Sequence, residues 1–201
     1  MSELLRPGGF MLTEKALELI VLSGGSRVLD IGCGGGATVS LLRACGFDAY
    51  GVDIELARNA PPELIYADAT ALPFERGSFD AVFFECSLSK IDRPELALTE
   101  ARRVLKSSGA LVVSDLFTRG EACDFSGILG RLEPWPDILG RTDRCSFRLR
   151  CFEEHGDALA TFWGQLVFDH GLKAAMQLIC GCADALKSPD NSYFLAVFDA
   201  V

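Results

Sequence analysis

The feature that most constrains this chain is a strand, a glycine-rich turn and a helix in direct succession. The strand is Arg27 to Ile31, short and apolar, and a helical pattern from residue 37 to 45 ends at Gly46. Between them stand Gly-Cys-Gly-Gly-Gly (32–36), and Gly32, Gly34 and Ala37 fit the spacing G-x-G-x-x-A. Only glycine leaves room for a ligand to approach the backbone so closely, so this turn predicts a bound nucleotide or nucleoside.

Strand and helix patterns alternate through the first half of the chain, which predicts an α/β fold with a parallel sheet and helices on both faces. The predicted strands are 27–31, 49–54, 64–67, 79–85, 110–115, 147–152 and 192–198. The predicted helices are 13–22 with Thr13 as a possible N-cap, 37–45, 94–105 capped by Asp92 and closed by 107–109, 157–168 and 172–186.

The length of 201 residues fits one domain, 1–201. Residues 26–117 are expected to form the cofactor-binding core, and 1–25 and 118–190 are expected to form cap elements on the substrate side. This second region contains Trp135 between two prolines, a residue that suits a lid, and several other aromatic side chains that could line an apolar pocket for a small organic acceptor.

Composition argues against several classes of partner. The net charge is −9, from 19 basic and 28 acidic residues, and an acidic chain repels nucleic-acid phosphates. The first ten residues resemble no signal peptide, and no apolar run reaches the roughly 18 residues of a membrane-spanning helix. With eight scattered cysteines interpreted as reduced thiols, we expect a cytoplasmic protein with no membrane partner.

Three acidic residues indicate the chemistry of the ligand. Asp30, Asp53 and Asp68 each end one of the first three predicted strands. Carboxylates there would repel a pyrophosphate but attract S-adenosylmethionine (SAM), which carries an ammonium and a sulfonium. Asp53 is placed to accept from ribose hydroxyls, and Asp68 from an adenine amino group. Each acid could instead be a helix cap or turn residue, but three in register with the glycine turn favour SAM.

The sequence resembles the class I SAM-dependent methyltransferases, and within them the small-molecule branch that includes the ubiquinone and menaquinone methyltransferases. The resemblance is strong over residues 26–117 and loose elsewhere. It is carried by four stretches in order, V-L-D-I-G-C-G-G-G-A (28–37), G-V-D-I (51–54), A-D-A-T-A-L-P-F-E-R-G-S-F-D-A-V (67–82) and A-L-T-E-A-R-R-V-L-K-S-S-G-A-L-V-V-S-D (97–115).

The resemblance implies a Rossmann-like, seven-stranded, mostly parallel sheet with helices on both faces and an antiparallel last strand. It also implies a SAM site in which the glycine turn holds the methionine end, Asp53 and Ile54 the ribose and adenine, and Asp68 and Ala69 the adenine. Glu85 and Cys86 would face the cofactor and the acceptor. With Asp30 added on the grounds of its charge, the predicted cofactor-binding residues are Asp30, Gly32, Cys33, Gly34, Asp53, Ile54, Asp68, Ala69, Glu85 and Cys86.

The sequence names no catalytic base. Many relatives carry histidines after the fourth strand, whereas this chain has Ser87-Leu88-Ser89-Lys90-Ile91. Methyl transfer from a sulfonium requires mainly that donor and acceptor are held in line, so a base is not obligatory. The weak catalytic candidates are His155, Cys86 and Glu85, and each has a structural interpretation as well.

Two other functions stay open. Five cysteines follow residue 118, and Cys180-Gly181-Cys182 could chelate a soft metal if it lay in a loop, which would suit a SAM-binding, thiol- or metalloid-linked module without transfer activity. No C-x-x-C pair is present, so no metal site is predicted. A nicotinamide-dependent dehydrogenase could use the same kind of glycine turn.

Overall fold

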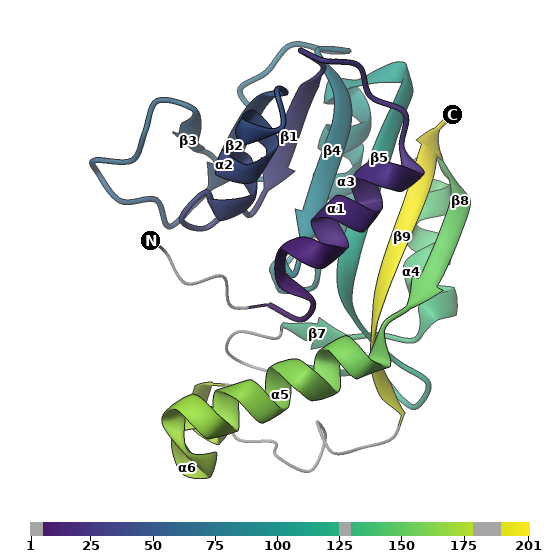
Figure 1. Ribbon diagram of the computed structural model, residues 1–201. Coiled ribbons are helices and arrows are strands. Elements are labelled where there is room, and N and C mark those ends of the chain that lie inside the picture. The colour runs from purple at the N-terminus through teal and green to yellow at the C-terminus, as the bar shows by residue number, and fades with distance from the viewer. Residues whose placement is uncertain (1–5, 125–129, 179–189) are drawn as a thin grey trace.

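The computed structural model describes residues 6–124, 130–178 and 190–201. A seven-stranded sheet with strand order β3-β2-β1-β4-β5-β9-β8 runs through it, with helices on both faces (Figure 1). Its strands are β1 (Arg27–Ile31), β2 (Asp48–Asp53), β3 (Leu64–Tyr66), β4 (Phe79–Glu85), β5 (Leu105–Thr118), β8 (Phe147–Glu154) and β9 (Asn191–Ala200). Only β9 runs antiparallel to its neighbours, so the predicted fold class is confirmed.

Helices α1 (Gly9–Leu19) and α2 (Ala37–Ala44) cover one face of the sheet, and α3 (Pro94–Val104) and α4 (Trp135–Arg144) cover the other. Below the carboxyl ends of the parallel strands lies α5 (Gly156–His170), followed by α6 (Leu172–Leu178) (Figure 1). The remaining elements are the 3-10 turn η1 (Leu88–Lys90) and a ribbon of β6 (Cys123–Asp124) and β7 (Arg131–Leu132). No helix in the described ranges is long and apolar enough to cross a membrane.

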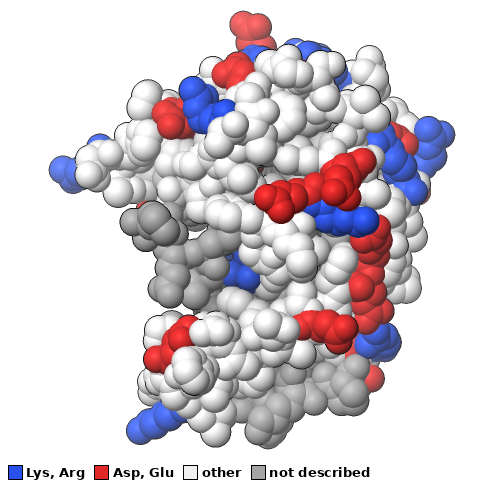
Figure 2. Space-filling model, viewed as in Figure 1, with Lys and Arg blue, Asp and Glu red and all other residues white. Residues whose placement is uncertain are grey.

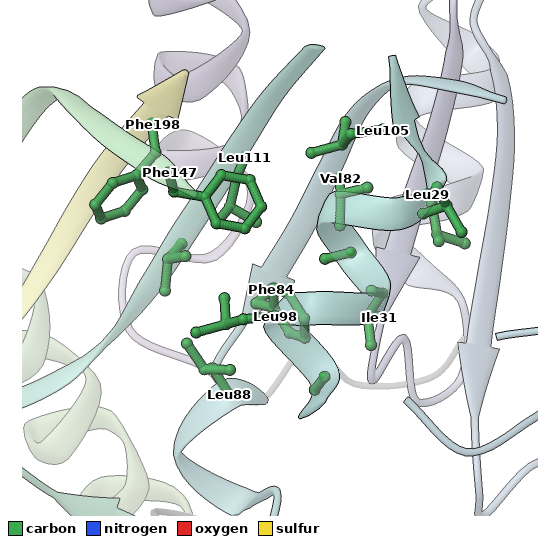
Figure 3. Packing of buried hydrophobic residues seen from close by; sticks show 14 of the residues in the cluster. Leu29, Ile31, Val82, Phe84, Leu88, Leu98, Leu105, Leu111, Phe147 and Phe198 are labelled. Carbon is green, nitrogen blue, oxygen red and sulfur yellow. The ribbon is translucent and has the colours of Figure 1, made fainter. Parts of the chain in front are cut away.

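The alternation of side chains along the central strands divides the core into two layers. Leu29 and Ile31 of β1 point toward α3, where they join Phe84 and Leu98, all fully buried (Figure 3). Val28, which precedes Leu29 on the strand, packs instead toward α1 and α2. Each such side chain contributes about 1.5–3 kcal/mol on burial, so the two layers fix the strands and thereby the edge where they end.

The structure corrects several predicted boundaries. Thr13 is not an N-cap, because α1 begins four residues earlier and Thr13 lies buried inside it. Asp92 caps no helix, since the N-cap of α3 is Arg93 without a side-chain bond. Residues 107–109 belong to β5, which starts directly after α3 because Leu105 already pairs with Phe79. The second half of the helix predicted over 172–186 lies outside the described residues.

Helix α4 was not expected at all. Its two prolines are compatible with helix, because Pro136 stands in the first turn, where no backbone donor is lost. Trp135 is not on a lid: its ring packs 4.2 Å from Phe152 and 5.2 Å from Phe194, between ring centroids. The aromatic side chain therefore anchors α4 to the sheet.

Candidate active site

The glycine turn is shaped by what surrounds it. Gly32 has φ +78°, and a Cβ there would come 2.4 Å from the Cβ of Ser87. Ser87 holds its place because its Oγ donates to the Ile31 carbonyl oxygen at 2.6 Å. Gly36, also at φ +78°, would drive a Cβ to 2.5 Å from Leu64. Gly34 differs, because nothing lies within 4 Å of its Cβ position, so this glycine faces open space that a ligand can enter.

A cavity of about 740 Å³ opens beside this turn, a size that suits a cofactor. It runs along the carboxyl ends of the parallel strands, where open α/β sheets bind their ligands. Gly32 and Gly34 line one part, and Asp53, Asp68 and Cys86 line others. Lys90 and Arg93, after β4, complete its far side together with Asp92.

Asp53 connects the end of β2 to the turn. Gly34 N donates to its Oδ2 and Glu55 N donates to its Oδ1, both at 2.8 Å. These bonds fix the plane of the carboxylate at the cavity wall. Ile54 next to it is 61% exposed although apolar, which suits a residue that covers a flat ring.

Asp68 is held by the turn that follows β3. Thr70 N and Thr70 Oγ1 both donate to its Oδ1 at 2.8 Å, and these bonds lower the pKa of the carboxyl. Asp68 is therefore ionised at neutral pH, and its Oδ2 remains able to accept from a ligand. Ala69 lines the same part of the cavity without a polar side chain.

Glu85 does not line this cavity but lies buried behind it. Thr13 Oγ1 of α1 donates to its Oε1 at 2.9 Å, Thr38 Oγ1 of α2 donates to its Oε2 at 2.8 Å, and the Arg6 guanidinium forms an ion pair with Oε2. One carboxylate thus ties the N-terminal segment and two helices to the end of β4. With its partners already supplied, Glu85 serves as an anchor rather than a base.

Asp30 lies near this ion pair, is 3% exposed and is not part of the cavity lining. Burial, and secondly the charge of Glu85, raise the pKa of the Asp30 carboxyl to about 8, while Arg6 acts in the opposite direction. No described residue gives it a hydrogen bond that would stabilise the charged form. Within the described part of the chain, the buried carboxyls of Glu85 and Asp30 thus have only the Arg6 guanidinium to balance their charge. Asp30, which has no hydrogen-bond partner among the described residues, keeps its proton.

Among the predicted site residues other than glycine, Cys86 alone has a left-handed backbone conformation, at φ +53°. Its thiol lies 3.1 Å from Tyr193 Oη, and that hydroxyl donates to Ser114 Oγ at 3.2 Å. Burial raises the pKa of the thiol to about 12, so it stays protonated and is a poor base at neutral pH. Cys33 points elsewhere, with its sulfur against Gly51 on β2, outside the cavity lining.

The structure does not bring His155 to this cavity. It precedes α5 and lines a second cavity of about 820 Å³ between the N-terminal segment and that helix. The six described cysteines are free thiols, and the described ranges contain no group of three or more His, Cys, Asp or Glu side chains able to hold a metal. Cys180 and Cys182 lie outside the described residues.

Four residues of this region were not predicted to support the site: Arg6, Thr13, which was expected only as an N-cap, Thr38 and Ser87. Thr13 and Thr38 stand at inward positions of their helices, and a polar side chain in an apolar helical face was a usable signal. A close neighbour of Gly32 could have been expected, because a position that only glycine can occupy often has another residue packed against it. Nothing in the sequence pattern marks Arg6, because its partner lies 79 residues away.

Comparison with known proteins agrees with this geometry. Residues 29–113 match the model of a methyltransferase domain. A demethylmenaquinone methyltransferase of Renibacterium salmoninarum is 38% identical over 98 residues, 45% of this chain and 41% of that protein. The chain therefore spans less than half the length of the first curated relatives it matches.

Two solved structures share the fold at a TM-score of 0.76. The [4+2]-cyclase SpnF is 22% identical, over 94% of this chain and 79% of that one. Geranyl diphosphate C-methyltransferase from Streptomyces coelicolor, solved with S-adenosyl-L-homocysteine, is 15% identical, over 95% of this chain and 80% of that one. The predicted resemblance to SAM-dependent methyltransferases is thus confirmed for residues 29–113, which match a methyltransferase domain, and the two structures share the fold of the chain.

Proposed function

We propose that this protein transfers the methyl group of SAM to a small organic acceptor. The observation that carries the proposal is the cavity beside the glycine turn, whose wall has Asp53 and Asp68 where a nucleoside needs acceptors. Behind the turn, the buried pair of Asp30 and Glu85 shares a single guanidinium, which favours a ligand that brings positive charge. A diphosphate would instead bring further negative charge next to these two acids.

The residues present fit SAM, because Gly34 leaves open space for it and the two acids line the same cavity. When bound, SAM supplies an electrophilic methyl group on a sulfonium, which an acceptor displaces in line. Asp53 would hold the ribose, Ile54 and Ala69 would flank the adenine, and Asp68 would accept from its amino group. Cys86, fixed by Tyr193, would form the wall next to the reacting atoms.

The protein's contribution to the reaction is then positioning and exclusion of water. Neither Cys86 nor Glu85 suits the role of base, since the first holds its proton and the second is engaged by three partners. We place the protein in the cytoplasm and exclude nucleic acid as its partner, in keeping with free thiols and a net charge of −9.

A binding and turnover experiment tests the proposal. Asp53→Ala is expected to weaken binding of S-adenosylhomocysteine by about 1.5–3 kcal/mol in calorimetric titration, the usual value of hydrogen bonds to a charged group. Asp48→Ala is the matched control, because Asp48 begins the same strand and pairs with Arg27 at the opposite edge of the sheet. Equal affinity in both variants removes the ribose assignment.

Transfer itself needs its own readout, since the same fold occurs in a cyclase. Methyl-labelled SAM is incubated with the protein and a panel of small organic molecules. Label that leaves SAM and appears in a panel member supports the enzyme. Tight cofactor binding with no transfer to any class of acceptor favours a binding module instead.

A further inference from the structure

The second cavity, between the N-terminal segment and α5, is lined by two residues that each have a buried side-chain nitrogen without a hydrogen-bond partner in the described part of the chain. Among the described residues, only two buried side-chain nitrogen or oxygen atoms lack a hydrogen bond: Arg6 Nε and His155 Nε2. Both residues line the cavity of about 820 Å³ between the N-terminal segment and α5. Figure 2 shows the surface hollowed in this region, between the sheet above and α5 below. Two orphan atoms in one cavity point to a ligand, because such atoms are rare in folded proteins.

Arg6 is the stronger of the two observations. Its side chain is only 6% exposed. The Nη atoms are engaged with Glu85, Thr13 and the Gly9 carbonyl oxygen, so Nε is the one nitrogen of the guanidinium without a partner among the described residues. A buried donor without a partner costs about 1–3 kcal/mol, which an acceptor atom from a ligand would offset.

The beginning of α5 adds backbone donors to the same space. Its intrahelical bonds start with Ala158 N, which donates to His155 O, so Gly156 N and Asp157 N precede them. The N-cap His155 gives no side-chain bond to these groups. Gly156, Asp157 and Ala158 all line the cavity, and the helix dipole places partial positive charge there.

Two acidic residues, Glu154 and Asp157, also line the cavity. Glu154 is exposed and forms an ion pair with Arg119, and Asp157 is exposed to solvent, which screens its charge. His155 Nε2 has Glu153 Oε2 at 3.3 Å, without hydrogen-bond geometry. Phe162 and Met11 supply apolar surface. The cavity thus combines buried donors with an apolar side.

We infer that this second cavity binds the methyl acceptor, and that the acceptor is a small organic acid whose anionic oxygen meets Arg6 Nε and the first amides of α5. The inference rests on the proposed function. Arg6 lines the second cavity and pairs with Glu85, and the next residue in the chain, Cys86, lines the cofactor cavity, so one ion pair links the two linings. An acceptor bound at Arg6 would then be held close to the methyl donor.

The test uses three matched aromatic fragments, benzoate, benzamide and benzylammonium, added to the ¹⁵N-labelled protein saturated with S-adenosylhomocysteine. Benzoate is expected to bind and to shift the NMR signals of Arg6 Nε–H and of the Gly156 and Asp157 amides. Arg6→Lys keeps the charge beside Glu85 but lacks the Nε–H, so its Kd for benzoate should rise about tenfold. Arg150→Lys, in an ion pair with Asp199 elsewhere, is the control and should leave both affinities unchanged.

Two results would overturn the inference. Benzylammonium that binds as well as benzoate would show that the cavity does not select anionic oxygen. A loss of S-adenosylhomocysteine affinity in Arg6→Lys with unchanged benzoate binding would assign the guanidinium to the cofactor. If Arg6→Lys does not fold, His155→Gln takes its place, with the same expected rise in Kd. Failure of S-adenosylhomocysteine to bind wild type refutes the proposed function separately, because benzoate binding is measured in its absence as well.

Discussion

Binding of the cofactor should take a proton off Asp30, and this can be measured. In the ligand-free protein the pKa of this carboxyl is raised to about 8 by burial and by the charge of Glu85. At pH 7 about 9% of the molecules then carry the charged form, and at pH 8.5 about 76%. An ammonium group that needs the carboxylate should therefore bind about eightfold more tightly at pH 8.5 than at pH 7.

The assay is calorimetric titration with S-adenosylhomocysteine in buffers of different ionisation enthalpy. Wild type should release about 0.9 proton per molecule bound at pH 7 and far less at pH 8.5. Asp30→Asn corrects for the titration of the ligand and of all other groups, and should show weaker binding with little of this release. The same proton release in wild type and variant would refute the link between Asp30 and the cofactor.

The raised pKa of Asp30 should also make the stability of the ligand-free protein depend on pH. Between pH 4 and 8 the folded protein holds a proton on Asp30 that the unfolded chain has lost, since the raised pKa belongs to the folded state alone. The free energy of unfolding therefore falls as pH rises through this window. The Tm of Asp30→Asn should exceed that of wild type increasingly from pH 4 to pH 8, and a constant difference would contradict the assignment.

Two further substitutions test the structure around the site. Gly32→Ala should lower the free energy of unfolding more than Gly46→Ala does in chemical unfolding. A non-glycine residue in the left-handed conformation costs about 1–2 kcal/mol at either position, but only at Gly32 must Ser87 also move. Equal losses in the two variants would contradict the close contact between Gly32 and Ser87. Glu85→Gln should lower the free energy of unfolding by about 3 kcal/mol because a buried guanidinium loses its partner, whereas Glu95→Gln, in a half-exposed pair, should cost under about 1 kcal/mol; similar values for the two would rule out the anchoring role.

The cofactor half of the fold could be predicted because its requirements are local. Strand β4 was predicted with its observed bounds, since a run apolar on both faces is typical of a central parallel strand. The glycine turn and the acids at the ends of β2 and β3 follow their strands directly, so sequence order alone places them at one edge. Whether these side chains hold SAM stays a prediction.

The second half resisted prediction for a physical reason. Helix α4 contains Trp135, Pro136 and Gly140 and follows Pro134, residues that indicate a loop when taken one by one. Its stability comes from packing of Trp135 on the sheet. The ion pair of Arg6 and Glu85 likewise depends on contacts across 79 residues. Tertiary packing overrides local preference in such segments, and no periodicity in the sequence reports it.

The buried charges give a physical reason for this glycine turn to favour a cationic ligand over an anionic one. Thr13 and Thr38 satisfy Glu85 with neutral hydroxyls, so Arg6 is the one cation among the groups that contact it. With Asp30 beside them, the cluster has two acids and one base, and it reaches neutrality by keeping a proton. A ligand ammonium can replace that proton at no net change of buried charge, whereas a diphosphate would add negative charge to a region of low dielectric. Selection against dinucleotides then follows from charge balance behind the turn, in residues that lie outside the cavity lining.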